Sequence, residues 1–460
     1  MTNLVASRAA SSGSAPEPPP PSRNLVLGVV GGLVLLAGYA VATGNGIYLL
    51  GALGFVVALL LSVTLHEAGH FLTARRYGMK ATQFFVGFGP TLWSRRTGET
   101  EWGVKAIPAG GFVKIVGMTP LEEVAPEDES RVFYKAPVRQ KVVVLAAGST
   151  VHFVLALLVL FGGSYLIGAP EERAPAVGAV QQCVAPDRLG AEDLSPDTDL
   201  CELPGSRPAP ALAAGLQQGD LLVEVDGEPV GRSTVLTSAL RSAGSRPVEL
   251  TVERDGRTLT VPVTPERLQR FALTKEGEPQ RLEPVGTIGI RVQQRFDTAR
   301  LGFVDSLEQT RELVVLQLQG IKTTVTTKLG SITKVYSEDR DPQGFVGIVG
   351  VGRISGEVIE SDETAGVKAL TFVTIVAGLN LFVGLFNLLP LLPLDGGHIA
   401  VAVYEGARDR VRRLRGYRGP FQRVDYTKLL PLTYGVAGFF LLFTVVLLGA
   451  DIVNPIRISQ

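Results

Sequence analysis

The feature that most constrains this chain is a set of apolar blocks, each long enough to cross a lipid bilayer. A helix needs about 20 apolar residues to do so. Five segments pass: Leu25–Thr43, Gly46–Phe71, Val142–Ile167, Ala369–Leu394 and Leu430–Gly449. The first could instead be a cleaved signal peptide, but it has neither a strong basic flank nor a small-residue cleavage site. The sequence therefore predicts an α-helical polytopic membrane protein with about five transmembrane helices.

The charge between these blocks predicts the orientation of the chain. Residues 404–428 hold eight Lys/Arg against three acids, and residues 75–141 hold eleven against seven. The long segment 169–365 holds 21 against 30 and is acidic. Basic loops face the cytoplasm, so we expect the N-terminus and both basic segments inside and segment 169–365 outside. The overall balance of 44 Lys+Arg against 44 Asp+Glu argues against nucleic acid as a partner.

A metal-binding motif, His66-Glu67-Ala68-Gly69-His70, ends the second apolar block. On a helix, His66 and His70 lie one turn apart on one face, so both imidazoles can reach one zinc ion. Glu67 lies beside them and can take a proton from a water molecule that zinc activates. The chain has only four His, which makes the match specific.

In most soluble zinc proteases the third ligand follows the motif closely, but in this chain it does not. The next comparable signal is Asp395, which follows the fourth apolar block in NLLPLLPLDGGH, residues 387–398. A carboxylate near an apolar span is costly unless it is paired, and metal ligation would offset that cost. Two Pro and two Gly should break the helix there and expose backbone that could line a cavity.

At these residues the chain resembles the site-2 protease family of intramembrane zinc proteases, in particular the bacterial branch that cleaves anti-sigma factors. That family pairs HExxH with N-x-x-P-x-x-x-L-D-G on a later span. The resemblance, over about residues 46–450, implies one zinc ion held by His66, His70 and Asp395, and Glu67 as the general base. It also implies that Asn387 binds or positions the substrate backbone.

Two further stretches are similar to elements of this family. Val86–Pro90 and Gly110–Val113 resemble its loop elements. On its own, the stretch Glu101–Met118 (EWGVKAIPAGGFVKIVGM) predicts a strand–turn–strand hairpin on the cytoplasmic side. The hairpin would dip toward the membrane around Gly110, Gly111 and Phe112 and offer an unpaired edge to an extended substrate. An ordinary loop sheet that packs on the domain is the alternative.

The chain departs from the family pattern at residues 147–152, AGSTVH, where A-G-P-x-x-N is usual. Ser149 replaces Pro, and His152 replaces Asn. His152 therefore lies where a polar residue of the active site is expected. It could be a polar group satisfied within the helix bundle or a fourth zinc contact, and the sequence does not decide between these roles.

The acidic outer segment contains a stretch, residues 175–265, that resembles a PDZ domain, an α+β fold. The resemblance rests on AVGAV at 176–180, ALAAGLQQGD at 211–220 and LLVEVDGEPV at 221–230. Such domains bind peptides by strand addition, although a purely steric module is an alternative. An insert, residues 181–210, carries both cysteines, Cys183 and Cys201, which we expect to form a disulfide outside the cytoplasm.

The expected organisation follows from these features. It comprises a Pro/Ser tail (1–23), a transmembrane hairpin that ends in HEAGH (24–74), a membrane-associated β-hairpin region (75–141), a transmembrane helix (142–168), a PDZ-like domain with its Cys-containing insert (169–285), an amphipathic helix with a Gly-rich linker (286–368), a transmembrane helix with the LDGG motif (369–403), a basic cytoplasmic loop (404–429) and a last transmembrane helix (430–450).

The predicted function is that of a zinc endopeptidase of the bacterial cytoplasmic membrane, with single-pass membrane proteins such as pre-trimmed anti-sigma factors as substrates. The PDZ-like domain would bind trimmed substrate or exclude untrimmed substrate. A metal-binding transporter would need repeated spans and further buried charges, which the sequence does not show. A protease-dead scaffold would lack Glu67 or Asp395, and both are present.

Overall fold

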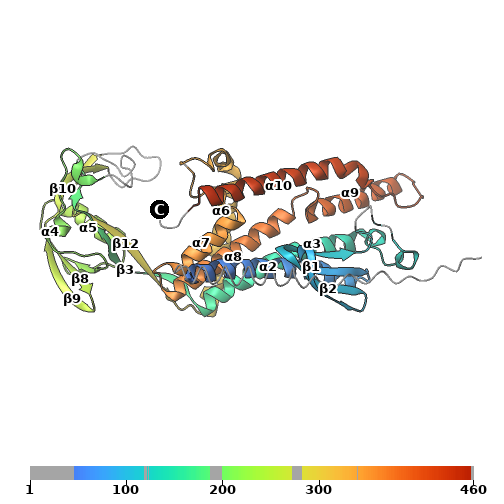
Figure 1. Cartoon of the computed structure of the whole chain (residues 1–460), viewed down its shortest axis with the longest axis horizontal. Coiled ribbons are helices and arrows are strands. Elements are labelled where there is room, and N and C mark those ends of the chain that lie inside the picture. Colours follow the sequence, from blue (N-terminus) through green and yellow to red (C-terminus); the bar gives the residue numbers. More distant parts are fainter. Residues whose placement is uncertain are drawn as a thin grey trace, which may run out of the picture. The chain divides into compact units, whose positions relative to one another are not determined.

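The computed structural model describes residues 46–118, 122, 124–186, 199–271, 282–338 and 340–456. The tail and the first predicted span, Leu25–Thr43, lie outside the described residues. The chain divides into two compact units. A helical unit comprises residues up to Gly163 together with 307–361 and 371–460, and a β-rich unit comprises residues 164–306 and 362–370. Figure 1 shows the helices of the first unit and the strands of the second, with their labels.

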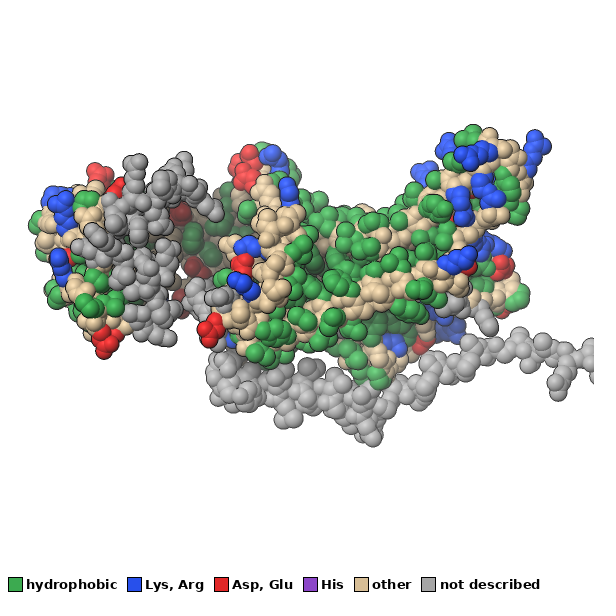
Figure 2. Space-filling view, turned by 90° about the horizontal axis from the view of Figure 1, so that it is seen from above, with side chains coloured by type: hydrophobic (Ala, Val, Ile, Leu, Met, Phe, Trp, Pro, Cys, Tyr) green, Lys and Arg blue, Asp and Glu red, His purple; other side chains and the backbone are tan. Residues whose placement is uncertain are grey.

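Four helices in the described residues are long and apolar enough to cross a membrane. They are α2 (Gly46–Arg76), α3 (Val138–Leu166), α8 (Ala365–Asn387) and α10 (Leu430–Val453), the last preceded by the 3-10 turn η6 (Tyr426–Leu429). Figure 2 shows hydrophobic side chains over most of the visible face of these helices, with Lys and Arg gathered at the end where α9 lies. This distribution is the one expected for a multi-pass membrane protein.

The segment that the sequence suggested to be a Gly-rich linker is partly a helix, α7 (Ile348–Glu360), which packs on α2. The interpretation as a linker was wrong for these residues. A Cβ on Gly51 would lie 2.4 Å from the Ser355 carbonyl oxygen, and one on Gly356 would lie 2.6 Å from the Tyr48 ring. The small residues therefore let the two helix backbones approach closely, as is common between helices in membranes.

The amphipathic segment at 301–329 is a helix, α6 (Phe303–Thr327), followed by the 3-10 turn η5 (Leu329–Lys334). Leu313, Val314 and Ile321 pack against a buried cluster of α3 and α8 residues. The Gln317 amide donates a hydrogen bond to the Thr374 carbonyl at 3.1 Å. This part of α6 thus lies on the core of the helical unit.

The fourth apolar block is divided by its prolines. Helix α8 ends at Asn387, and α9 begins at Asp395 and continues to Leu414. Eleven residues of the segment predicted as a basic loop, from Tyr404 to Leu414, thus belong to the C-terminal part of α9. The two glycines after Asp395 let residues 388–392 fold against the start of α9, because a Cβ on Gly396 or Gly397 would lie 2.3–2.5 Å from that backbone.

The strands between α2 and α3 form a small antiparallel sheet from β1 (Ala81–Thr97) and β2 (Thr100–Ile115), both long and bent. Residues 83–86 of β1 pair with 101–104 on one side and with 111–114 on the other. The predicted hairpin of residues 101–118 was therefore wrong in its pairing, since its two arms pair with opposite sides of β1 instead of with each other. The bends fall at glycines with positive φ, such as Gly87 and Gly110. The 3-10 turns η1 (Pro126–Asp128) and η2 (Phe133–Lys135) follow.

The β-rich unit is built on one sheet with the order β12-β3-β6-β8-β9 and with β7 beside β6. The strands are β3 (Ala169–Val180), β6 (Leu221–Val225), β7 (Glu228–Pro229), β8 (Val248–Arg254), β9 (Arg257–Val263) and β12 (Ile290–Ala299). The short helix α4 (Pro210–Ala213) and α5 (Ser233–Ala243) cover a core that includes Leu222, Leu236 and Leu250, all fully buried. Because β12 belongs to this sheet, the unit extends beyond the predicted boundary at residue 285.

Two smaller pairs of strands complete this unit. Strands β10 (Glu266–Phe271) and β11 (Leu282–Thr287) form one pair, and β4 (Cys183–Val184) and β5 (Arg207–Pro208) form the other. Cys201 lies in the 3-10 turn η4 (Leu200–Glu202) and is joined to Cys183 by a disulfide, with 5.3 Å between the Cα atoms. The predicted pair of cysteines thus closes the insert onto β4.

Candidate metal centre

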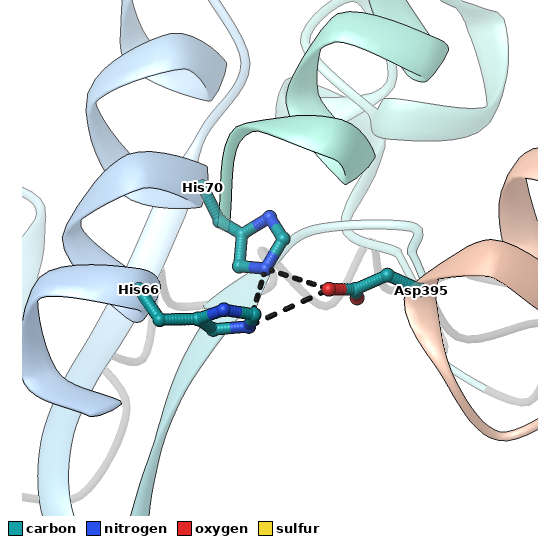
Figure 3. Close-up of side chains that lie close together, drawn as sticks. All are labelled: His66, His70 and Asp395. Atoms are coloured by element: carbon teal, nitrogen blue, oxygen red, sulfur yellow. Dashed lines mark hydrogen bonds and ion pairs between the residues drawn. The ribbon is translucent and has the colours of Figure 1, made fainter. Parts of the chain in front are cut away.

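The two histidines of the HEAGH motif lie on one face of α2 and converge on Asp395 at the start of α9 (Figure 3). The Nε2 atoms of His66 and His70 are 3.1 Å apart. Asp395 Oδ2 lies 3.4 Å from the first and 3.3 Å from the second. Both histidines are buried, and the Asp395 side chain is 16% exposed. Residues more than 300 positions apart thus form one compact ligand set.

These distances fit a single zinc ion. Tetrahedral ligands at the usual 2.0–2.2 Å from zinc lie about 3.3–3.6 Å from one another, which is close to the three separations observed here. In the described residues, Asp395 Oδ2 is buried and accepts no hydrogen bond. A buried oxygen without a donor is costly, and a cation would satisfy it. The three side chains therefore suit zinc both in atom type and in spacing.

The environment of His70 fixes which of its nitrogens faces the ligand set. His70 Nδ1 lies 2.7 Å from the Val144 carbonyl oxygen on α3. A carbonyl can only accept, so Nδ1 carries the proton and Nε2 keeps a lone pair for the metal. Helix α3 comes this close because residue 148 is Gly, whose added Cβ would lie 2.5 Å from His66 Cε1 and from His70 Nε2.

Asp395 is positioned by the way α9 begins and by a buried ion pair further along that helix. Its carboxylate lies in the first turn of α9, where the helix dipole favours a negative charge. Glu405 on the same helix meets Lys141 of α3 at 3.5 Å, with both side chains about 5% exposed. Glu405 also accepts a hydrogen bond from the Val424 N–H at 2.7 Å. The ion pair with Lys141 ties α9 to α3, which also contacts both histidines.

Glu67 lies between the ligand set and the small sheet. The Val113 N–H of β2 donates a hydrogen bond to Glu67 Oε2 at 2.9 Å. Gly111 lies next to the same side chain, because a Cβ there would be 3.4 Å from Glu67 Cγ. The Phe112 ring stacks on Phe85 with 5.5 Å between ring centroids. The structure thus brings the predicted substrate-binding segment, Gly110 to Phe112, beside the predicted general base.

Two other predicted residues lie outside the ligand cluster. Asn387 is the last residue of α8 and is half-buried. His152 of α3 is buried against His66, with 4.9 Å between ring centroids, but is not a member of the cluster. Its Nδ1 is instead 2.8 Å from Asn380 Oδ1. The structure therefore gives no support to a fourth zinc contact from His152.

The sequence analysis missed Asn380, Ser62 and Gly148, all of which lie at or beside this centre. Asn380 is the one Asn in the interior of α8 and the one polar side chain between residues 375 and 386 of that helix. A polar side chain within a transmembrane segment usually has a functional role, so this signal could have identified it. Gly148 lies in the AGSTVH segment compared with the family pattern above, but the sequence does not show that this glycine faces the histidines.

Comparison with known proteins identifies the family. The model of peptidase family M50 matches residues 54–421, most of the chain. This chain belongs to peptidase family M50. It is 37% identical to zinc metalloprotease Rip1 of Mycobacterium tuberculosis over 90% of this chain and 100% of that protein. It is 36% identical to zinc metalloprotease Rip1 of Mycolicibacterium smegmatis, over 89% and 99% of the two chains. Metalloprotease MmpA of Caulobacter vibrioides is 27% identical over 86% and 94%.

Membership in the M50 family confirms the predicted resemblance to site-2 proteases. The protein is a zinc metalloprotease, a hydrolase of peptide bonds, and its apolar helices make it a multi-pass membrane protein. Zinc bound at such a centre acts as a Lewis acid that activates water and polarises a carbonyl. His66, His70 and Asp395 could hold such an ion, and the Glu67 carboxylate lies beside them.

Proposed function

We propose that this protease cleaves single-pass membrane proteins within or next to the bilayer, at a zinc ion held by His66, His70 and Asp395. The observation that carries the proposal is the convergence of these side chains from α2 and α9, beside Glu67. Helix α2 is itself long and apolar enough to span the membrane. Peptide-bond hydrolysis at this centre would therefore take place close to the membrane, where a transmembrane substrate is accessible.

Glu67 is the proposed general base. Its Oε2 accepts the Val113 N–H, so Oε1 is the oxygen that remains for a proton. Oε1 would take a proton from the attacking water and pass it to the leaving amine. The hydrogen bond from Val113 holds the carboxylate in place while this happens.

The edge of the small sheet is the proposed binding site for the substrate backbone. Among the described residues, 111–114 pair with a strand on one side, β1, and an extended peptide can add to the other side. Strand addition also supplies what proteolysis needs, because a helical substrate hides its peptide carbonyls in internal hydrogen bonds. Gly110, Gly111 and Phe112 would line this edge, and Asn387 would bind or orient the substrate backbone.

The finer features of the proposal concern location and partners. We infer that the protein lies in the bacterial cytoplasmic membrane, with the basic segments inside and the β-rich unit outside, as the distribution of Lys and Arg favours. The β-rich unit would act as a PDZ-like module that binds trimmed substrate or excludes untrimmed substrate. An anti-sigma factor shortened on its outer side is the proposed substrate class.

Reconstitution into liposomes tests this function. Purified full-length protein should cleave a co-reconstituted single-pass test substrate, and the cleaved bond should map by mass spectrometry to the transmembrane segment or its border. The Glu67→Gln variant is the matched control, because it keeps all three proposed ligands. If the wild-type protein instead cleaved only a soluble peptide from the outer domain, the proposal of cleavage within or next to the bilayer would be wrong.

A test of the β-rich unit needs a variant that disrupts its fold. A bulky residue at Gly215 would not serve, since none of the described residues lies within 4 Å of an added Cβ there. Only its φ of +78° disfavours other residues. Leu222→Asp is the sharper change, because Leu222 is fully buried in the core of the unit. Cleavage of untrimmed substrate by this variant supports exclusion, whereas loss of cleavage of trimmed substrate supports recruitment.

A further inference from the structure

The two imidazoles of the metal centre are held in place in different ways. His70 donates from Nδ1 to the Val144 carbonyl. His66 Nδ1 is buried and has no hydrogen-bond partner among the described residues. Metal-bound histidines almost always use their second nitrogen in such a bond, which fixes the ring. The orientation of His66 must therefore depend on packing.

Two residues of α3 provide that packing. Gly148 lies against the His66 ring, since an added Cβ would be 2.5 Å from Cε1 and 2.7 Å from Nδ1. The His152 ring lies 4.9 Å from the His66 ring, centroid to centroid, at an interplanar angle of 40°. The His152 ring can fix the orientation of the His66 ring only if the His152 ring is itself held in place.

His152 is fixed by a buried hydrogen-bond network between three helices. Asn380 Oδ1 on α8 lies 2.8 Å from His152 Nδ1, and it accepts a hydrogen bond from the Ser62 hydroxyl of α2, also at 2.8 Å. The Asn380 amide nitrogen donates to the Val376 carbonyl at 2.8 Å. The oxygen can only accept, so His152 Nδ1 is the donor, and both lone pairs of Asn380 Oδ1 are used.

The burial of this network indicates a purpose beyond packing. Ser62 is 5% exposed, and Asn380 and His152 are each 1% exposed. Polar side chains within transmembrane segments are rare and usually functional. Apolar residues would fill the same space without the need to satisfy every polar atom. The network instead joins α2, α3 and α8 at the ring that contacts His66.

We propose that His152 is a positioning residue, anchored by Asn380 and Ser62, whose ring sets the orientation of His66 as a metal ligand. This inference rests on the proposed ligand set. It gives a role to the residue at which this chain departs from the family pattern. His152 does not bind the metal in this arrangement, because its ring lies outside the ligand cluster.

Cobalt substitution in the full-length, detergent-solubilised protein tests the proposal without reference to activity. Co²⁺ replaces Zn²⁺, its visible absorption reports the geometry of the ligands, and competition with a chelator gives the affinity. His152→Ala and Asn380→Leu should each weaken metal affinity by about 10–100-fold, the usual effect of losing an outer-shell partner. The cobalt spectrum should change in both. The double variant should be no weaker than the weaker single variant, because the two residues act as a unit.

Two further variants make the outcome decisive. His152→Phe keeps a ring against His66 but loses the bond to Asn380, so its cobalt spectrum should also change. Thr150→Ala is the control on α3, since Thr150 is exposed and its hydroxyl donates to the Ala146 carbonyl of the same helix. It should match the wild-type protein in affinity and spectrum.

The results separate failure of this inference from failure of the ligand set. Wild-type spectra and affinities in His152→Phe and Asn380→Leu would overturn the positioning role while leaving the metal centre intact. A wild-type protein that binds no cobalt or zinc would overturn the ligand set itself. A loss of thermal stability in the metal-free variants with unchanged metal affinity would assign the network a structural role and would also overturn the proposal.

Discussion

Asp395 in the helical unit and Asp220 in the β-rich unit are both largely buried, yet their carboxylates have opposite surroundings. Asp220 is 1% exposed, and both of its oxygens accept hydrogen bonds from Arg254, at 2.6 and 2.7 Å. The Gln217 N–H donates to it as well, at 2.8 Å. Asp395 Oδ2 is buried beside two histidine nitrogens without any donor in the described residues.

This difference distinguishes a carboxylate that the protein itself stabilises, Asp220, from one that could bind a cation, Asp395. Burial of a charge is costly in both places. At Asp220 the protein itself offsets the cost, because hydrogen bonds from Arg254 and from the Gln217 N–H satisfy the carboxylate. At Asp395 the cost is left for a cation to offset. A buried carboxylate oxygen that accepts no hydrogen bond and lies beside other possible metal ligands is thus a more informative sign of a site than a buried carboxylate alone.

Replacement of each aspartate by alanine should affect a different property, zinc content for Asp395 and stability for Asp220. Asp395→Ala should remove most of the bound zinc and reduce proteolysis to background, because two histidines alone leave the ion underligated. Asp220→Ala should leave zinc content unchanged and destabilise the β-rich unit by about 1–3 kcal/mol, the cost of leaving charged hydrogen-bonding groups unpaired. Metal analysis and thermal unfolding measure the two effects. Full zinc occupancy in Asp395→Ala would show that the third ligand lies elsewhere.

Glu67→Gln should have the next largest effect. The amide cannot take a proton, so turnover should fall by about 10²–10⁴-fold. Zinc content should stay near that of the wild-type protein, because His66, His70 and Asp395 remain. This variant sharpens the comparison, since one carboxylate at the centre, Asp395, would hold the metal and its neighbour, Glu67, would move protons. Near-normal cleavage by the variant would remove Glu67 from the mechanism.

Much of this site could be predicted from the sequence, because local spacing encodes it. His66 and His70 lie one helical turn apart, and the prolines after Asn387 require a break before Asp395. The pairing of β2 could not be predicted in the same way. Residues 101–104 and 111–114 are equally good strands, and only the tertiary structure shows that β1 lies between them.

The same limit applies to the helices around the site. The glycines of α7 suggested a linker, although small residues are favourable where membrane helices touch. That contact with α2 is visible only once Gly51 and Gly356 are seen to face their partners. Asn380 was overlooked for a related reason. Its role depends on Ser62 and His152, which the chain brings to it from more than 200 residues away.

Loss of the disulfide should affect the β-rich unit alone. Cys183 and Cys201 are 18 positions apart, and closing a loop of that length stabilises a fold by about 3 kcal/mol in the chain-entropy description. Cys183→Ala/Cys201→Ala protein should therefore lose stability in this unit, as followed by hydrogen exchange of β4 and β5. Zinc content should not change. Loss of zinc on removal of the disulfide would show that the two units are coupled.

The smallest expected effect is the pH dependence of the β-rich unit. Burial alone would raise the pKa of Asp220, but the bonds from Arg254 and from the Gln217 N–H outweigh it and hold the pKa below its ordinary value. A carboxyl whose folded pKa is lowered contributes stability above its unfolded pKa of about 3.9, and that stability is lost as the pH falls through the folded value. Unfolding of this unit should therefore become easier as the pH drops from about 5 toward 3. Hydrogen exchange of β6 and β8 in the full-length protein measures it, and Asp220→Asn should flatten the dependence. An equal pH dependence in Asp220→Asn would assign the effect to other carboxylates and would leave Asp220 without its proposed structural role.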